Sequence, residues 1–213
     1  MKTSGPSIAL IDYGAGNLTS VRKGFAAAGA ELLSPRHPED LTGVAAIVVP
    51  GVGHFGATAT LDGAWRDAIR EAVGLGVPLL GICLGLQWLF AGSDEAPEAR
   101  GLGAIPGRCT RLPSGRKVPH VGWNSIEIIR PSRLLTGLRD GTQVYFTHSY
   151  AAPVTDECAA VTTYGDRFAA AVERDNVFGV QFHPENSGAA GIAILRNFVA
   201  VGGASGEAGH GRM

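Results

Sequence analysis

Short apolar runs alternate with helical patterns along residues 7–90, and glycines stand in most of the turns between them. The apolar runs lie at residues 7–11, 32–33, 44–49 and 78–83. Apolar residues recur at helical spacing in residues 18–28, 65–73 and 84–90. Strands that read as continuous apolar runs are buried on both faces by helices. The alternation therefore predicts an α/β fold with a doubly wound, mostly parallel sheet flanked by helices.

The pattern changes after Gly101, where strand-like stretches follow one another with few helices between them. They lie at residues 104–112, 125–129, 143–148, 159–164, 169–173 and 177–182. We interpret them as antiparallel additions at one edge of the sheet. A last helical pattern covers residues 188–201, and the Gly/Ser/Ala-rich residues 202–213 are expected to form a frayed tail.

Length and charge limit the class of protein. A chain of 213 residues is long enough for one α/β domain, which we expect to span residues 1–201. Eighteen Lys and Arg against nineteen Asp and Glu leave a formal net charge of -1, so nucleic acid and anionic membranes are not expected partners. No apolar run reaches the roughly 18 residues of a membrane span, and the first residues lack the pattern of a signal peptide. We expect a cytoplasmic protein.

The three cysteines are Cys83, Cys109 and Cys158, an odd number at wide and irregular spacing. This pattern fits neither a disulfide framework nor a zinc site, and no metal or cofactor is expected. A functional cysteine in this chain would act singly.

Cys83 stands at the centre of the sequence Gly81-Ile82-Cys83-Leu84-Gly85, where a buried strand is predicted to turn into a helix. Glycines flank a nucleophile in such an elbow because a Cβ would collide with neighbouring backbone. The N-terminus of a helix favours the reactive thiolate. The alternative is a small cysteine buried in the core.

His183 and Glu185 stand two residues apart at the end of the last predicted strand, with Pro184 between them. Pro184 keeps His183 extended, and residues two apart in an extended segment project to the same side. His183 could then take the proton of Cys83 while Glu185 orients the imidazole ring. A strand-end histidine beside a solvated glutamate is the alternative.

The sequence Pro50-Gly51-Val52-Gly53 follows the strand at residues 44–49, at the carboxyl edge of the sheet where ligand sites of α/β proteins gather. The glycines permit unusual backbone angles, so a backbone N–H there could face an oxyanion together with the N–H of Leu84. An ordinary glycine-rich turn is the alternative.

The sequence Gly14-Ala15-Gly16-Asn17 suggests a nucleotide-binding loop, but Thr19 replaces the third glycine of that pattern. No acidic residue ends the second predicted strand. We therefore reject a dinucleotide site.

Six motifs in order along the chain resemble the class I glutamine amidotransferases, a family with a Cys-His-Glu triad. Three carry the general resemblance: GICLGLQ at 81–87, PGVG at 50–53 and QFHPE at 181–185. Three narrow it to the glutaminase subunits of imidazole glycerol phosphate synthase: DYGAGN at 12–17, PHVGWN at 119–124 and YFTHSY at 145–150. The resemblance covers residues 8–198 and implies a role in histidine biosynthesis.

The resemblance implies that L-glutamine is hydrolysed on this chain and that ammonia passes to a (β/α)8-barrel cyclase subunit. It implies that Cys83 is the nucleophile, His183 the general base and then acid, and Glu185 the residue that orients His183. Backbone N–H groups of Val52 and Leu84 would bind the oxyanion. Residues expected to hold glutamine are Gln87, Glu95, Ser149 and Tyr150. Residues expected to face the cyclase are Asn17, His120, Trp123 and Tyr145.

The expected glutamine site is chemically reasonable, because Glu95 could pair with the α-ammonium group while backbone N–H groups near Ser149 receive the carboxylate. For Glu95 the alternative is a solvated helix end. For Trp123 the alternative is core packing, since tryptophan is favoured both in cores and at interfaces.

One residue departs from the family. The family reads His-Pro-Glu-Lys-Ser where this chain has Asn186 in place of the lysine. The departure leaves the triad intact, but it puts in doubt a charged interface contact that the resemblance implies. Two other functions stay open: a glutaminase subunit of another amidotransferase, such as anthranilate or pyridoxal phosphate synthase, and a catalytically silent binding protein.

Overall fold

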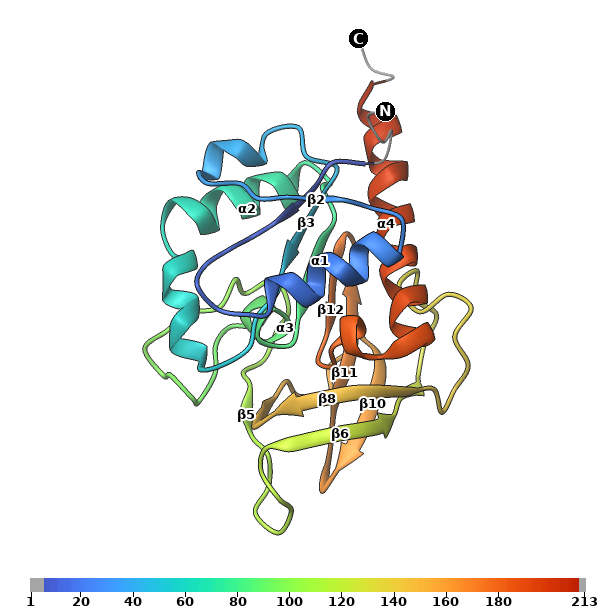
Figure 1. The fold of residues 1–213 in the computed structure, drawn as a ribbon. Helices are drawn as coiled ribbons and strands as arrows, with labels where there is room; N and C mark the ends of the chain where they lie inside the picture. The colour runs from blue at the N-terminus through green and yellow to red at the C-terminus, as the bar shows by residue number, and fades with distance from the viewer. Residues whose placement is uncertain (1–5, 211–213) are drawn as a thin grey trace.

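The computed structural model describes residues 6–210, and an eight-stranded sheet forms its centre (Figure 1). The strand order is β2-β1-β3-β4-β12-β11-β10-β7. The parallel strands are β1 (Ile8–Leu10), β2 (Leu32–Leu33), β3 (Ala46–Val49), β4 (Leu79–Ile82) and β12 (Val177–Val180). The antiparallel strands at one edge are β11 (Asp166–Arg174), β10 (Cys158–Tyr164) and β7 (Glu127–Ile128). The predicted sheet is confirmed.

Helices cover both faces of this sheet, as the continuous apolar runs predict. The α-helices are α1 (Leu18–Ala27), α2 (Ala64–Gly74), α3 (Leu84–Leu89) and α4 (Gly188–His210). The 3-10 helices are η1 (Pro38–Leu41), η2 (Phe55–Leu61) and η3 (Pro184–Asn186). Of the helices within residues 6–210, none is long and apolar enough to span a membrane.

Side chains that alternate between the two faces of the sheet divide the core into two layers. In β1, Ile8 and Leu10 pack with Phe25 of α1 and Phe198 of α4, whereas Ala9 packs in the layer that contains α2 and α3. Successive side chains of a strand point to opposite faces, so an all-apolar strand supplies both layers. The carboxyl ends of β3, β4 and β12 lead directly into the loops that carry PGVG, Cys83 and His183.

Two antiparallel ribbons lie beside the main sheet: β5 (Thr110–Arg111) with β9 (Tyr150–Ala151), and β6 (His120–Ser125) with β8 (Gln143–His148). Figure 1 shows β6 and β8 crossing below the lower end of β12. The His183 backbone N–H donates to Tyr145 O of β8 at 2.8 Å, which joins this ribbon to the end of β12.

The two largest differences from the predicted strands concern β5 and β6. Residues 104–109 are outside strands, and only Thr110–Arg111 forms β5, because the turn at Pro106-Gly107, with Gly107 at φ 108°, interrupts the stretch. Strand β6 occupies His120–Ser125, where no strand is predicted before Ser125, because pairing with all of β8 outweighs its weak local strand preference.

The chain end also differs from the expected tail. Helix α4 continues to His210, whereas residues 202–213 were expected to fray. Gly202 is buried, and a Cβ placed there would lie 3.1 Å from the Ala46 Cβ, so the helix still packs on the start of β3 at this point. Residues 211–213 lie outside the described residues. A domain limit at residue 201 stays a prediction.

Candidate active site

Cys83 lies in a sharp elbow between β4 and α3. Its φ of 54° and ψ of -103° are unusual for a residue with a side chain, and such strain clusters at functional sites. A Cβ at Gly81 would overlap the Gly85 backbone, and one at Gly85 would overlap the Val49 carbonyl oxygen. The predicted reason for the flanking glycines is therefore confirmed.

The Cys83 side chain is 4% exposed and lies between two other segments. Its Sγ is 3.6 Å from Gln181 Nε2 of the segment after β12 and 3.8 Å from Thr147 O of β8. Cys83 therefore differs from an ordinary core cysteine, because polar groups converge on it.

His183 and Glu185 form a buried pair, with His183 Nδ1 2.8 Å from Glu185 Oε1. The predicted contact is present, but its predicted geometry is wrong in part. His183 is extended, whereas Glu185 lies in the 3-10 turn η3, and this turn brings the carboxylate back to the ring. The backbone is held because Ser187 Oγ donates to His183 O at 2.7 Å.

The charge state of His183 follows from its neighbours. Burial opposes the charged ring, but the adjacent Cys83 and Glu185 more than offset this and raise the pKa of His183 to about 10. Within the described residues, His183 Nε2 is buried without a hydrogen-bond partner. A protonated ring with a free Nε2 is suited to deliver a proton to a reacting atom.

The loop at Pro50–Gly53 faces Leu84 in a defined orientation. The Leu84 N–H donates to Gly51 O at 3.3 Å, so a carbonyl occupies the donor expected to bind an oxyanion. The Val52 side chain is 38% exposed. Tyr13 supports the loop, since its hydroxyl donates to Pro50 O at 2.7 Å, and burial raises the pKa of this phenol. The resting loop is therefore closed to an oxyanion.

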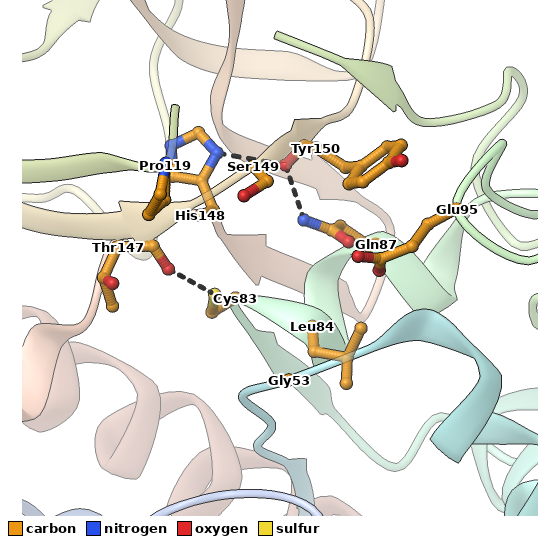
Figure 2. A pocket seen from close by; sticks show the side chains of 10 residues that line it. All are labelled: Gly53, Cys83, Leu84, Gln87, Glu95, Pro119, Thr147, His148, Ser149 and Tyr150. Carbon is orange, nitrogen blue, oxygen red and sulfur yellow. Dashed lines mark hydrogen bonds between the residues drawn. The ribbon is translucent and has the colours of Figure 1, made fainter. Parts of the chain in front are cut away.

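A pocket of about 270 Å³ opens beside Cys83, a size suited to a small molecule (Figure 2). Its lining residues are Gly53, Cys83, Leu84, Gln87, Glu95, Pro119, Thr147, His148, Ser149 and Tyr150. The set includes all four residues expected to hold glutamine.

Gln87 and His148 fix the far wall of the pocket. Gln87 Nε2 donates to Tyr150 O at 2.7 Å, and His148 Nδ1 lies 3.0 Å from the same oxygen (Figure 2). A carbonyl oxygen only accepts, so Nδ1 carries the proton. Burial lowers the pKa of His148 to about 3, which keeps the ring neutral. The backbone of Ser149 and Tyr150 is thus held in one position.

Glu95 is half-buried at the side of the pocket. Its Oε2 accepts from the Phe55 N–H at the start of η2, at 2.7 Å. The alternative of a solvated helix end is therefore wrong. A carboxylate with one oxygen anchored and the group facing a pocket can receive a cation there.

Of the four residues expected to face a partner, Asn17, Trp123 and Tyr145 reach the surface and His120 does not. Trp123 is 56% exposed and packs edge-on against Tyr145 with ring centroids 6.1 Å apart, so core packing of Trp123 is wrong. Asn17 is exposed and caps α1, its Oδ1 accepting from Ser20 N at 3.2 Å. The expectation that His120 faces the partner is wrong, because His120 is buried and its ring stacks on that of Tyr164 with centroids 4.0 Å apart. Its odd spacing from Trp123 places the two on opposite faces of β6.

Three residues at the site were missed: Gln181, Thr147 and His148. Gln181 stands two residues before His183 in the otherwise apolar stretch at residues 177–182, and this parity could have placed it beside Cys83. Thr147 and His148 lie inside YFTHSY, but their contacts depend on pairing with distant elements.

Cys109 and Cys158 lack the features of a reactive cysteine. All three are unpaired, and burial raises the pKa of both Cys109 and Cys158. Among residues 6–210, no three His, Cys, Asp or Glu side chains are grouped so that they could hold a metal ion.

The chain is similar to known proteins over most of its length. A family model described as "Glutamine amidotransferase class-I" matches residues 9–201. The chain is 49% identical over 196 residues to "Imidazole glycerol phosphate synthase subunit HisH" of Methanothermobacter thermautotrophicus, covering 91% of this chain and 98% of the relative. It is 46% identical over 207 residues to the protein of that name from Moorella thermoacetica, covering 95% and 99%.

Solved structures support the fold. PurLQS from Thermotoga maritima matches with a TM-score of 0.74 at 17% identity, covering 92% of this chain and 98% of that one. A structure described as a glutamine amidotransferase matches with a TM-score of 0.73 at 22% identity, with the same coverage.

Proposed function

Because this chain belongs to the class I glutamine amidotransferases, and within them to the HisH subunits of imidazole glycerol phosphate synthase, we propose that Cys83, His183 and Glu185 perform its glutamine hydrolysis. The proposal rests on the buried His183–Glu185 pair, which lies beside Cys83. Cys83 itself lies in a strained elbow and lines a small pocket. The ammonia released serves imidazole glycerol phosphate formation in histidine biosynthesis.

In the first half-reaction, His183 acts first as the base that takes the proton of Cys83, and the resulting thiolate adds to the carboxamide carbon of glutamine and forms a tetrahedral intermediate. His183 gives its Nε2 proton to the leaving nitrogen, the carbon–nitrogen bond breaks, and ammonia leaves a γ-glutamyl thioester on Sγ. The pKa of about 10 supports this role, because the ring carries the proton at neutral pH.

In the second half-reaction, His183 takes a proton from water while the water oxygen adds to the thioester carbon. The carbon–sulfur bond breaks, glutamate leaves, and the thiolate and protonated His183 are restored. Glu185 holds the ring in place through Nδ1 in both steps and stabilises its charged form.

Substrate recognition uses the two ends of the pocket. Glu95 would receive the α-ammonium group, and the backbone beside Ser149 and Tyr150 would receive the α-carboxylate. The two hydrogen bonds to Tyr150 O, from Gln87 and His148, support this role because they hold that backbone rigid.

The partner is the (β/α)8-barrel cyclase subunit, and we propose that it docks on the exposed side of the β6–β8 ribbon. Val121 and Trp123 are 58% and 56% exposed there, and the paired residues Thr147 and Tyr145 lie on the same side. Exposed aromatic and aliphatic groups beside an active site are typical of a protein interface. Asn186, which replaces the family lysine, is exposed on η3 and gives this interface one positive charge fewer.

A cytoplasmic location is part of the proposal. Three unpaired cysteines, one of them the nucleophile, suit a reducing compartment.

The proposal is tested by glutamate release from L-glutamine in the complex with cyclase. His183→Ala should lower kcat almost as much as loss of the nucleophile, and Glu185→Ala should cost roughly 10- to 100-fold less. In the unmodified complex, activity should fall as pH rises through about 10, the pKa of His183. The Glu185 carboxylate helps to raise this pKa, so the fall in activity should occur at lower pH in Glu185→Ala. An inactive Glu185→Ala beside an active His183→Ala would reverse the assigned roles.

Trp123→Ala should raise the cyclase concentration needed for half-maximal stimulation by about 10- to 100-fold, because a large exposed aromatic is a typical anchor of an interface. Glutaminase activity without cyclase should be unchanged. The matched control is Leu75→Ala. Leu75 is 79% exposed and lies at the C-terminal end of α2, outside the β6–β8 ribbon. Equal shifts for both variants would contradict a docking surface on the β6–β8 ribbon.

A further inference from the structure

One arginine closes the loop that carries Glu95. Arg108 Nε donates to Asp94 Oδ1 at 2.7 Å, and its Nη2 donates to Ser93 O at 2.7 Å and to Pro97 O at 3.3 Å. These acceptors lie on both sides of Glu95 in the sequence. The planar guanidinium therefore bridges the two ends of a short segment, which a single point charge such as lysine matches poorly.

Glu95 is held at two further points. Its backbone N–H donates to Ser93 Oγ at 3.2 Å, and its Oε2 accepts from the Phe55 N–H at 2.7 Å. Arg108 is absent from the lining of the pocket, whereas Glu95 belongs to it. Of residues 93–97, which Arg108 binds, Glu95 is the one that lines the pocket, so we expect Arg108 to affect substrate through the position of the Glu95 carboxylate.

The contact with Asp94 alone would have little effect, because side chains that are 38% and 56% exposed form an ion pair in water. The two backbone carbonyls distinguish Arg108 from such a pair. Gly92 adds a spatial constraint, since a Cβ there would lie 2.6 Å from Arg108 Nη1. The guanidinium thus fits against glycine backbone while it binds the loop.

We propose that Arg108 is a positioning residue for recognition of the substrate ammonium group: by holding residues 93–97, it fixes the carboxylate of Glu95 that receives the ammonium. This inference rests on the proposed glutaminase function and adds to it a residue outside the pocket. It concerns binding of one substrate group and leaves the thioester chemistry unchanged.

The test is steady-state glutaminase kinetics in the full complex with cyclase and its nucleotide ligand. Arg108→Ala should raise KM for glutamine about tenfold and leave kcat within about twofold, because only a ground-state contact is loosened. Glutaramate, which is glutamine without its α-amino group, should give the same kcat/KM with both proteins. A merely structural role would lower kcat/KM for both substrates alike.

Gly92→Ala supplies a second variant that keeps the arginine but displaces it. It should raise KM for glutamine in the same direction, and adding it to Arg108→Ala should give no further increase, since both changes act through one contact. Arg133→Ala is the control, because Arg133 pairs with Glu173 at 2.7 Å in another loop, and its KM should equal that of the unmodified chain.

Three results would overturn the inference: an unchanged KM in Arg108→Ala, equal losses with glutamine and glutaramate, or a full additional increase from Gly92→Ala in the Arg108→Ala background. Failure of the proposed function is distinguishable, because the unmodified complex would then release no glutamate from glutamine.

Discussion

Replacing Cys83 with alanine should abolish glutamine hydrolysis, lowering kcat by more than about 10⁴-fold, while the fold remains intact. The loss is large because removing the nucleophile of such a triad removes the covalent route. The fold survives because alanine is smaller than cysteine and the flanking glycines, whose close contacts shape the elbow, are unchanged. Glutamate release and the thermal unfolding midpoint measure the two parts of this prediction.

Cys158→Ala is the matched control for Cys83→Ala. Cys158 is also buried, 1% exposed, but it contacts Thr155 and Pro153 rather than the pocket. This variant should lose some stability and keep its glutaminase rate. A Cys83→Ala protein that hydrolysed glutamine near the unmodified rate would remove the basis for the proposed mechanism.

Liganded cyclase should accelerate glutamine hydrolysis by roughly 100- to 1000-fold over the isolated chain. The isolated chain has the Leu84 N–H bonded to Gly51 O, so the oxyanion donor is occupied. Rotation of the Gly51–Val52 peptide would free Leu84 and turn the Val52 N–H toward the same point. An oxyanion donor contributes about 2.7 to 4 kcal/mol to the transition state in other enzymes, which sets the size of the effect.

The acceleration is measured as glutamate production by the chain alone, with cyclase, and with cyclase plus its nucleotide ligand. The Cys83→Ala complex provides the background. Equal turnover by the isolated chain and the liganded complex would contradict a peptide rotation that depends on the partner. It would indicate that the loop at Pro50–Gly53 adapts to glutamine without a partner.

Local rules explain why much of the site was predictable. The elbow at Cys83 needs glycines at fixed positions because neighbouring backbone leaves no room for a Cβ, so its signature lies within five residues. His183 and Glu185 are close in sequence, so their contact required only a short turn.

The rest depended on pairing between distant segments. A motif such as PHVGWN does not reveal that His120–Ser125 pairs with Gln143–His148, and only this register turns His120 inward and Trp123 outward. The orientation of the peptide after Gly51 was equally unpredictable, since glycine permits both directions. Arg108 reaches residues 93–97 through contacts that no local pattern in the sequence describes.

Trapping the acyl-enzyme would show whether Cys83 carries the γ-glutamyl group during turnover. The complex of this chain with liganded cyclase is mixed with isotopically labelled glutamine, quenched in acid within the first turnovers, digested and analysed by mass spectrometry. We expect a γ-glutamyl group on the peptide that contains Cys83, lost on treatment with hydroxylamine and absent in Cys83→Ala. Glutamate release with no label on Cys83, or with the label on another residue, would contradict this expectation.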